Sequence, residues 1–207
     1  MKILAIDLGT HTGWCLGEAG QIPKYGTLTL AKPKEIKQFG PERTARTDDP
    51  RIRRLWKWVH ELCRQEQPNV VIWEDVQFST YTFQVQLWSS LRTALQLGAR
   101  SAHDRNQPMI FECVPVQTLK KFASFGSADK SAMKRALLKK HPEIEISGCD
   151  DNAIDAIWLF KWAEYFLART FKPTQNEQRQ PTAQNSNQPA NLPECGSDER
   201  KPDSEPA

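Results

Sequence analysis

The stretch Ile3–Gly17 reads ILAIDLGTHTGWCLG, and it combines the pattern of a buried strand with an acid that interrupts it. Its first four residues are apolar, and the apolar pattern resumes at Trp14 after the polar segment Thr10–Gly13. Asp7 therefore stands at the rim of a core, where an unpaired carboxylate is costly. We expect Asp7 to be hydrogen-bonded, paired or bound to a cation. The stretch by itself is equally compatible with an acid that only stabilises the turn.

The composition separates the chain into two parts. Residues 173–207 are rich in Pro, Gln, Asn, Ser and Glu and contain almost no large apolar side chains, so we expect a disordered polar tail. Residues 1–172 are long enough for one domain with a sizeable core. The tail holds three basic and six acidic residues, which leaves 25 Lys and Arg against 19 Asp and Glu in residues 1–172. This mild basicity permits a polyanionic partner without requiring one.

The cysteine pattern and the hydropathy exclude several classes of protein. The five cysteines are odd in number, widely spaced and without a CxxC pair, which argues against a disulfide framework or a zinc site. We find neither a signal sequence before the first strand nor an apolar run of the roughly 20 residues that a membrane span needs. We therefore expect a soluble protein of the reducing cytoplasm with no membrane partner.

Hydrophobic periodicity predicts an alternation of strands and helices. Residues 2–30 are expected to form an antiparallel meander of three strands, with turns at Gly9–Gly13 and Gly17–Gly20. Two further strands are expected at Asn69–Trp73 and Met109–Val114. Helices are expected from about Asp48 or Asp49 to residue 67, over 82–103, as two short helices within 116–140, and over 151–168. This order predicts an α/β fold with a mixed sheet.

Carboxylates follow two of the predicted strands and begin the last predicted helix. Asp7 and Glu74 come at strand ends, and Asp151 and Asp155 lie about 40° apart on one helix face because each helical residue turns by about 100°. Asp151 could instead serve as a helix cap or first-turn acid. Asp155 has no such role, since it stands within an apolar helix. Carboxylates that converge in this way are suited to a pair of Mg²⁺ ions.

Four short motifs follow one another along the chain: IDLGTHTGW (6–14), VVIWED (70–75), GSADKS (126–131) and DDNAIDAIWL (150–159). In this order and spacing they resemble the RuvC-type Holliday junction resolvases, particularly the short phage-type members, within the RNase H-like superfamily. The resemblance covers residues 1 to about 168. It implies an RNase H-like fold with a five-stranded sheet flanked by helices.

The resemblance also implies roles for individual residues. Asp7, Glu74 and Asp155 match the metal ligands. The fourth family ligand lies three residues before the last, at Asn152 in this chain, and we assign it to the nearest acid, Asp151, with Asn152 or Asp150 as alternatives.

The family's Gly- and Lys-containing loop, which approaches DNA, matches PVQTLKKFASFGSADKSAM (115–133). The match implies DNA contacts by Lys120, Lys121 and Lys130. Lys130 is also a candidate to neutralise charge in the transition state, although a solvated lysine at a helix start is an alternative. Phe78 and Tyr81 follow Glu74 in a polar stretch, where they could stack on unpaired bases or make packing or dimer contacts.

The resemblance implies a Mg²⁺-dependent endodeoxyribonuclease, with Mn²⁺ as a substitute, that cuts four-way or three-way junctions and leaves 5′-phosphate and 3′-hydroxyl ends. The alternatives are an RNase H-like nuclease for flaps, RNA:DNA hybrids or RNA, and a non-catalytic DNA-binding module. Symmetric cutting needs two active sites, so we expect a homodimer through the helix at 82–103. IDLGT also opens actin- and Hsp70-type nucleotide-binding proteins, but the chain lacks residues for their second domain, so we expect no nucleotide cofactor.

Overall fold

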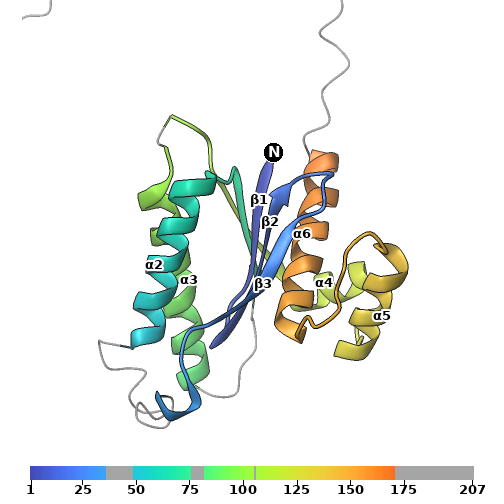
Figure 1. Cartoon of the computed structure of the whole chain (residues 1–207), viewed down its shortest axis with the longest axis horizontal. Helices are drawn as coiled ribbons and strands as arrows, with labels where there is room; N and C mark the ends of the chain where they lie inside the picture. The colour runs from blue at the N-terminus through green and yellow to red at the C-terminus, as the bar shows by residue number, and fades with distance from the viewer. Residues whose placement is uncertain (36–48, 76–81, 105, 171–207) are drawn as a thin grey trace, which may run out of the picture. The chain divides into compact units, whose positions relative to one another are not determined.

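The computed structural model describes residues 1–35, 49–75, 82–104 and 106–170, and these residues contain one five-stranded sheet with helices on both faces (Figure 1). The strands are β1 (Lys2–Asp7), β2 (His11–Glu18), β3 (Lys24–Thr29), β4 (Val70–Asp75) and β5 (Ile110–Pro115). The helices are α2 (Pro50–Glu66), α3 (Thr82–Ala102), α4 (Val116–Ala123), α5 (Lys130–Lys140) and α6 (Asp151–Thr170). The predicted tail lies outside the described residues.

The sheet is mixed, with the strand order β3-β2-β1-β4-β5. Strands β1, β2 and β3 form the predicted antiparallel meander, and β4 and β5 add to it in parallel with β1. Because β1, β4 and β5 are parallel, their carboxyl ends meet at one edge of the sheet. The α/β fold with a mixed five-stranded sheet is therefore confirmed.

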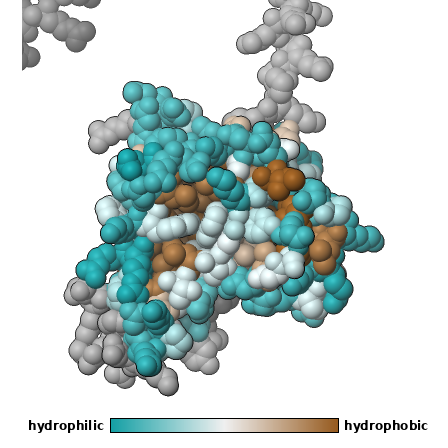
Figure 2. Space-filling model, in the orientation of Figure 1, coloured by the Kyte–Doolittle hydropathy of each residue, from teal (hydrophilic) through white to brown (hydrophobic). Residues whose placement is uncertain are grey.

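The helices form one layer on each face of the sheet. Figure 1 shows α2 and α3 together on one face, and α4, α5 and α6 on the other. Each layer has its own buried core: Leu4 and Ile6 of β1 pack with α2 and α3, whereas Ile3 and Ala5 pack with α6. The surface in the view of Figure 2 is largely hydrophilic, with separate apolar patches. No helix of the described ranges is both long and apolar enough to cross a membrane.

One detail of the predicted meander is wrong. The first turn is shorter than Gly9–Gly13, because β2 begins at His11 and Gly13 pairs with Asp7 inside the sheet. Likewise, Gly17 pairs with Ile3 within β2. Glycine often signals a turn, but here it makes room for a neighbouring element.

Gly13 allows the start of α6 to lie directly on the sheet. A Cβ atom at this position would lie 1.9 Å from the main-chain oxygen of Asn152 and 2.4 Å from its carbonyl carbon. Both atoms are backbone, so neither can move aside as a flexible side chain would. The absence of a side chain at Gly13 therefore lets the first turn of α6 lie against β2. Gly13 is also the residue that pairs with Asp7, so the start of α6 lies close to the end of β1.

We expect Gly13→Ala to lower the free energy of unfolding by about 2 to 3 kcal/mol, because α6 must move away from the sheet to admit the methyl group. Chemical denaturation would measure the loss. The control is Gly126→Ala, whose Cβ would meet the flexible side chain of Lys121, and we expect a change of about 0.5 kcal/mol or less there. Equal losses in the two variants would contradict the role of Gly13.

Candidate functional site

Strand alternation places Asp7 and Glu74 on the same face of the sheet. In β1, Ile3 and Ala5 belong to the core that faces α6, and Asp7 continues their row. In β4, Val70 and Ile72 belong to that core, and Glu74 continues theirs. The next acid along β4, Asp75, falls by the same alternation on the α2 and α3 face. Because β1 and β4 are neighbours in the sheet, the structure sets Asp7 beside Glu74 at its edge.

The first turns of α6 bring further acids to this edge. Asp150 is the residue that caps the helix: its Oδ1 accepts hydrogen bonds from the Ala153 main-chain nitrogen at 3.0 Å and from Thr27 Oγ1 at 2.5 Å. Burial raises the pKa of Asp150, but these hydrogen bonds outweigh it and lower the pKa below its usual value. Asp155 lies one turn further, between the buried residues Ile154 and Ala156.

Three carboxylates are coupled to one another electrostatically. Burial raises the pKa of Asp7 well above its usual value, and the charges of Glu74 and then Asp155 raise it further. Burial raises the pKa of Glu74 to about 7, with a second contribution from Asp155. Burial raises the pKa of Asp155 to about 6. The structure therefore gathers Asp7, Glu74 and Asp155 into one acidic site whose members resist ionisation together.

Two of the three predicted lysines reach this acidic site. Lys130, the first residue of α5, lowers the pKa values of Asp7 and Asp155. Lys120, on α4, lowers those of Glu74 and Asp155. Lys121 contributes to none of these shifts, and its side-chain carbons lie over Gly126 instead. The site thus combines three carboxylates with two ammonium groups from the neighbouring helices.

Asp151 has a different environment from the other acids. Its Oδ2 lies 3.3 Å from Lys130 Nζ, and the two side chains are 51% and 66% exposed, so this ion pair contributes little to stability. Asp151 raises the pKa of Asp155. Asn152, the alternative fourth ligand, follows it on the turn whose backbone lies on Gly13.

The chemistry of the site fits a hard divalent cation. Within the described ranges, no three His, Cys, Asp or Glu side chains lie close enough together to hold a metal ion as they stand. The donor set nevertheless consists of carboxylate oxygens, which Mg²⁺ prefers, and their mutual repulsion is what a bound cation would relieve. Asp7, Glu74 and Asp155 are therefore the residues that could hold such an ion.

Sequence reasoning missed two features of the site. Of the two alternatives to metal binding for Asp151, the structure confirms a first-turn acid and gives the cap of α6 to Asp150, and sequence reasoning did not anticipate the ion pair between Asp49 and Arg51 beside the β1–β2 turn. An Asp two residues before an Arg at a helix start would have been a usable signal for this pair. The predicted DNA-contacting residues Phe78 and Tyr81 lie outside the described residues.

Solved structures with a similar fold include RuvC and a mitochondrial Holliday junction resolvase. Thermus thermophilus RuvC is 17% identical over 82% of this chain and 96% of its own length, with a TM-score of 0.58. RuvC of the same organism in complex with a Holliday junction substrate is 15% identical over 83% and 96%, with a TM-score of 0.60. The yeast mitochondrial Holliday junction resolvase Ydc2 is 15% identical, and the match covers 82% of this chain and 83% of Ydc2, with a TM-score of 0.52.

No protein-family model matches the chain, and neither does any curated protein. At these identities the three structures establish a shared fold. They confirm that the fold is that of the RuvC-type resolvases, as the sequence motifs predict.

The raised pKa values predict an unusual dependence of stability on pH. An acid whose pKa is higher in the folded than in the unfolded protein stabilises the fold only while it is protonated, so stability falls as pH rises from about 4 to about 7. In metal-free buffer at pH 8, Glu74→Gln should therefore raise the free energy of unfolding by about 1 to 3 kcal/mol, and at pH 4.5 it should have little effect.

Glu61→Gln is the matched control, because hydrogen bonds from Arg64 lower the pKa of Glu61. We expect no stabilisation at pH 8 in that variant. Urea denaturation at the two pH values in the presence of EDTA would give both differences. Destabilisation of Glu74→Gln at pH 8 would show that Glu74 is held by favourable contacts and not opposed by burial and its acidic neighbours.

Proposed function

We propose that this protein is a Mg²⁺-dependent, structure-specific endodeoxyribonuclease that cleaves Holliday junctions or other branched DNA. One observation carries the proposal: Asp7, Glu74 and Asp155 gather at one edge of the sheet, with Lys120 and Lys130 beside them. The fold shared with the RuvC-type resolvases supports it. A cytoplasmic location, as the cysteine usage predicts, belongs to the same proposal.

In this proposal Asp7, Glu74 and Asp155, completed by Asp151, would hold two Mg²⁺ ions, for which Mn²⁺ could substitute. Bound cations of this kind activate water and stabilise the charges that develop when a phosphodiester is hydrolysed. The ammonium groups of Lys120 and Lys130 would hold and neutralise the phosphate at the same place. Lys130 Nζ lies 3.3 Å from Asp151 Oδ2, so both groups would be available at the same place.

The distribution of charge supports DNA as the partner. The segment 116–140, which contains α4 and α5, holds seven basic residues and one acid, whereas residues 1–172 as a whole have an excess of six basic residues. The positive excess is therefore concentrated in α4 and α5 and the loop between them, which lie next to the carboxylates. Positive charge concentrated beside the acidic site would attract the phosphate backbone of DNA to that site.

Two alternatives differ in their substrates. A nuclease of the same fold could act on flaps, RNA:DNA hybrids or RNA, and a binding module would not cut at all. Cleavage assays on a four-way junction, a three-way junction, a flap and an RNA:DNA hybrid, all with the full chain and Mg²⁺, distinguish these possibilities. We expect the branched DNAs to be cut fastest. Preferential cutting of the hybrid, or binding without cleavage, would replace the proposed activity.

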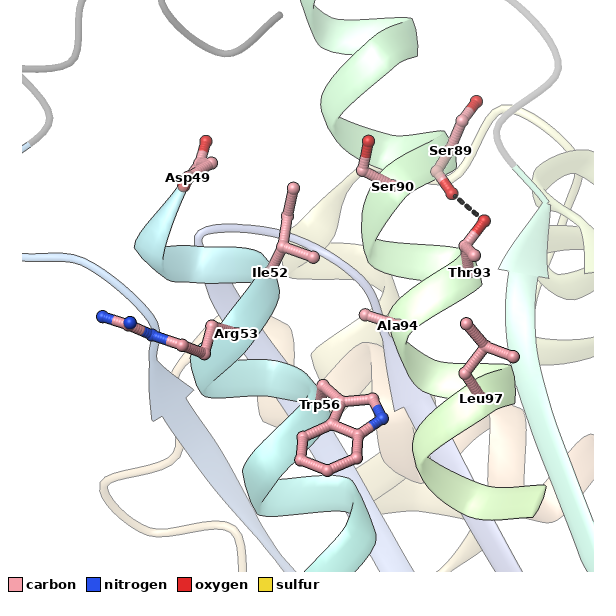
Figure 3. Close-up of a pocket in the computed structure, with 9 residues that line it drawn as sticks. All are labelled: Asp49, Ile52, Arg53, Trp56, Ser89, Ser90, Thr93, Ala94 and Leu97. Atoms are coloured by element: carbon pink, nitrogen blue, oxygen red, sulfur yellow. Dashed lines mark hydrogen bonds between the residues drawn. The ribbon is translucent and has the colours of Figure 1, made fainter. Parts of the chain in front are cut away.

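The outer surface of α2 and α3 is suited to a contact between two copies of the chain. A groove of about 570 Å³ runs between these helices (Figure 3). Trp56 on α2 and Leu97 on α3 line it and are 39% and 57% exposed, so two large apolar side chains face solvent in one groove. The residues that line the groove are Asp49, Ile52, Arg53, Trp56, Ser89, Ser90, Thr93, Ala94 and Leu97.

We therefore expect a homodimer that uses α3, and we expect Leu97→Glu to shift it towards the monomer, because a charge would be buried in the contact. Sedimentation equilibrium of the full chain would measure the shift. Leu138→Glu is the control, since Leu138 is equally exposed at 51% but lies on α5. A monomeric wild-type protein at tens of micromolar, or equal effects of the two changes, would contradict the interface.

The proposed roles of the carboxylates predict a separation of cutting from binding. Asp7→Asn, Glu74→Gln and Asp155→Asn should each reduce junction cleavage by at least about a thousandfold, while junction affinity stays within a few fold, because affinity depends on phosphate contacts elsewhere. Single-turnover cleavage and fluorescence anisotropy would measure the two quantities. Asp75→Asn, on the opposite face of β4, is the control. Retained cutting in any of the three variants would contradict the site.

The Mg²⁺ dependence of cleavage by substituted variants distinguishes whether Asp151, Asn152 or Asp150 is the fourth metal ligand. Asp151→Asn should leave stability nearly unchanged, because the Asp151 side chain is exposed, yet it should impair cleavage and respond to raised Mg²⁺ or to Mn²⁺. Asp150→Asn should need no rescue, since Asn is also a good helix cap. Mg²⁺ titrations of both variants would measure this. Full activity of Asp151→Asn at low Mg²⁺ would move the fourth ligand to Asn152 or Asp150.

A further inference from the structure

We propose that Arg51, held in place by Asp49, is a positioning residue for the acidic site: it fixes the turn that follows Asp7 and thereby orients the Asp7 carboxylate. The inference rests on the proposed function for its effect on turnover. The contacts between Asp49, Arg51 and Thr10 lie on the α2 side of the sheet. The acidic site faces α6 on the opposite side.

Arg51 and Asp49 form a buried, two-pronged ion pair at the start of α2. The Arg51 Nη2 and Nε atoms donate to Asp49 Oδ2 at 2.6 and 3.1 Å, and Nε also lies 3.0 Å from Oδ1. The two side chains are only 7% and 1% exposed. Asp49 Oδ1 also accepts from the Arg51 main-chain nitrogen at 2.9 Å, so this carboxylate caps the helix and fixes the guanidinium together.

The remaining edge of the guanidinium reaches the β1–β2 turn. Arg51 Nη1 donates to Thr10 Oγ1 at 3.2 Å. Two further hydrogen bonds of this turn stay within the meander: the Leu30 main-chain nitrogen donates to the Thr10 oxygen at 2.9 Å, and Thr12 Oγ1 donates to the Gly9 oxygen at 2.7 Å. The contact with Arg51 is a hydrogen bond that joins the turn to the α2 helix.

Stability does not account for this arrangement. Burying an ion pair contributes little net free energy, because the cost of removing both charges from water offsets their attraction. The docking of α2 is provided by Leu55, Val59 and Cys63, which are fully buried against the sheet. Asp49 and Arg51 are two residues apart, so their pairing does not itself connect distant parts of the chain. The pair holds the Arg51 guanidinium in a fixed position, from which its Nη1 atom donates a hydrogen bond to Thr10 Oγ1.

The position of Thr10 makes this donor relevant to the acidic site. Only Leu8 and Gly9 separate Thr10 from Asp7, the last residue of β1. Leu8 packs into the α2 and α3 core while Asp7 faces α6, so a shift of the turn would tilt β1 at its end and move the Asp7 carboxylate. Metal ligands and reacting groups lose much of their effect when misplaced by even about 1 Å.

The test compares Thr10→Val with Thr29→Val in the full-length protein. Thr10→Val has nearly the same shape but removes the acceptor of Arg51 Nη1. Thr29 is an exposed strand residue whose hydroxyl lies 3.4 Å from His11 Nδ1, and it has no contact with Arg51 among the hydrogen bonds of the described ranges. Arg51→Lys is the second variant, because it keeps the charge beside Asp49 but loses the planar fork. The double variant Thr10→Val with Arg51→Lys completes the cycle.

Four quantities are measured: the melting temperature, the dissociation constant for Mn²⁺ by calorimetry, junction affinity, and the single-turnover cleavage rate at saturating junction. We expect Thr10→Val to weaken Mn²⁺ binding and to slow cleavage by about fivefold or more, with junction affinity within twofold of wild type. The double variant should be no worse than the poorer single variant, because both changes remove one hydrogen bond. Thr29→Val should match wild type.

A lower melting temperature in Thr10→Val with unchanged Mn²⁺ binding and turnover would show that the contact is only structural and would overturn the inference. Independent, multiplying effects in the double variant would also overturn it. If the wild-type chain cut no branched DNA at all, the proposed function would fail. The Mn²⁺ affinities would still decide whether Arg51 positions the acidic site.

Discussion

The constraint on which this structure depends is the placement of several carboxylates at the edge of an apolar sheet. Asp7 and Glu74 continue rows of fully buried side chains, and Asp155 stands in a helix whose neighbouring residues are buried. Each acid therefore loses part of its hydration and also faces the charge of the others, which raises their pKa values. Such a cluster lowers the stability of the free protein, which is the cost expected of a site that binds a cation, as we propose.

The fold supports this cluster from both of its layers. On one face, Gly13 lets the backbone of α6 lie on β2, and Asp150 ties the start of that helix to Thr27 of β3. On the other face, the buried guanidinium of Arg51 reaches the turn after Asp7. The acids themselves sit at element ends, where strand and helix geometry sets their direction. The rest of the sheet is built mainly of close-packed aliphatic residues that hold those ends in register.

The sequence predicts the general architecture well because each signal is local. Apolar runs that end in acids locate β1 and β4, and strand alternation then explains why Glu74 and not Asp75 joins Asp7. Helical spacing likewise relates Asp155 to Asp151. Several features that sequence reasoning missed involve contacts between distant segments. The sequence pattern assigns Gly13 to a turn. The structure shows that Gly13 instead leaves room for the backbone of Asn152, which is far away in the sequence. The contacts of Asp150 with Thr27 and of Arg51 with Thr10 also join distant segments, whereas the Asp150 cap on Ala153 and the Asp49–Arg51 pair are local.

The central claim is that Asp7, Glu74 and Asp155 form one divalent-cation site, and anomalous diffraction from crystals of the full-length protein soaked in Mn²⁺ tests it most directly. The account predicts one or two anomalous peaks bound by carboxylate oxygens of these three residues at the carboxyl edge of β1 and β4. Occupied Mn²⁺ sites elsewhere on the protein, with none at this edge under conditions that support cleavage, would contradict it.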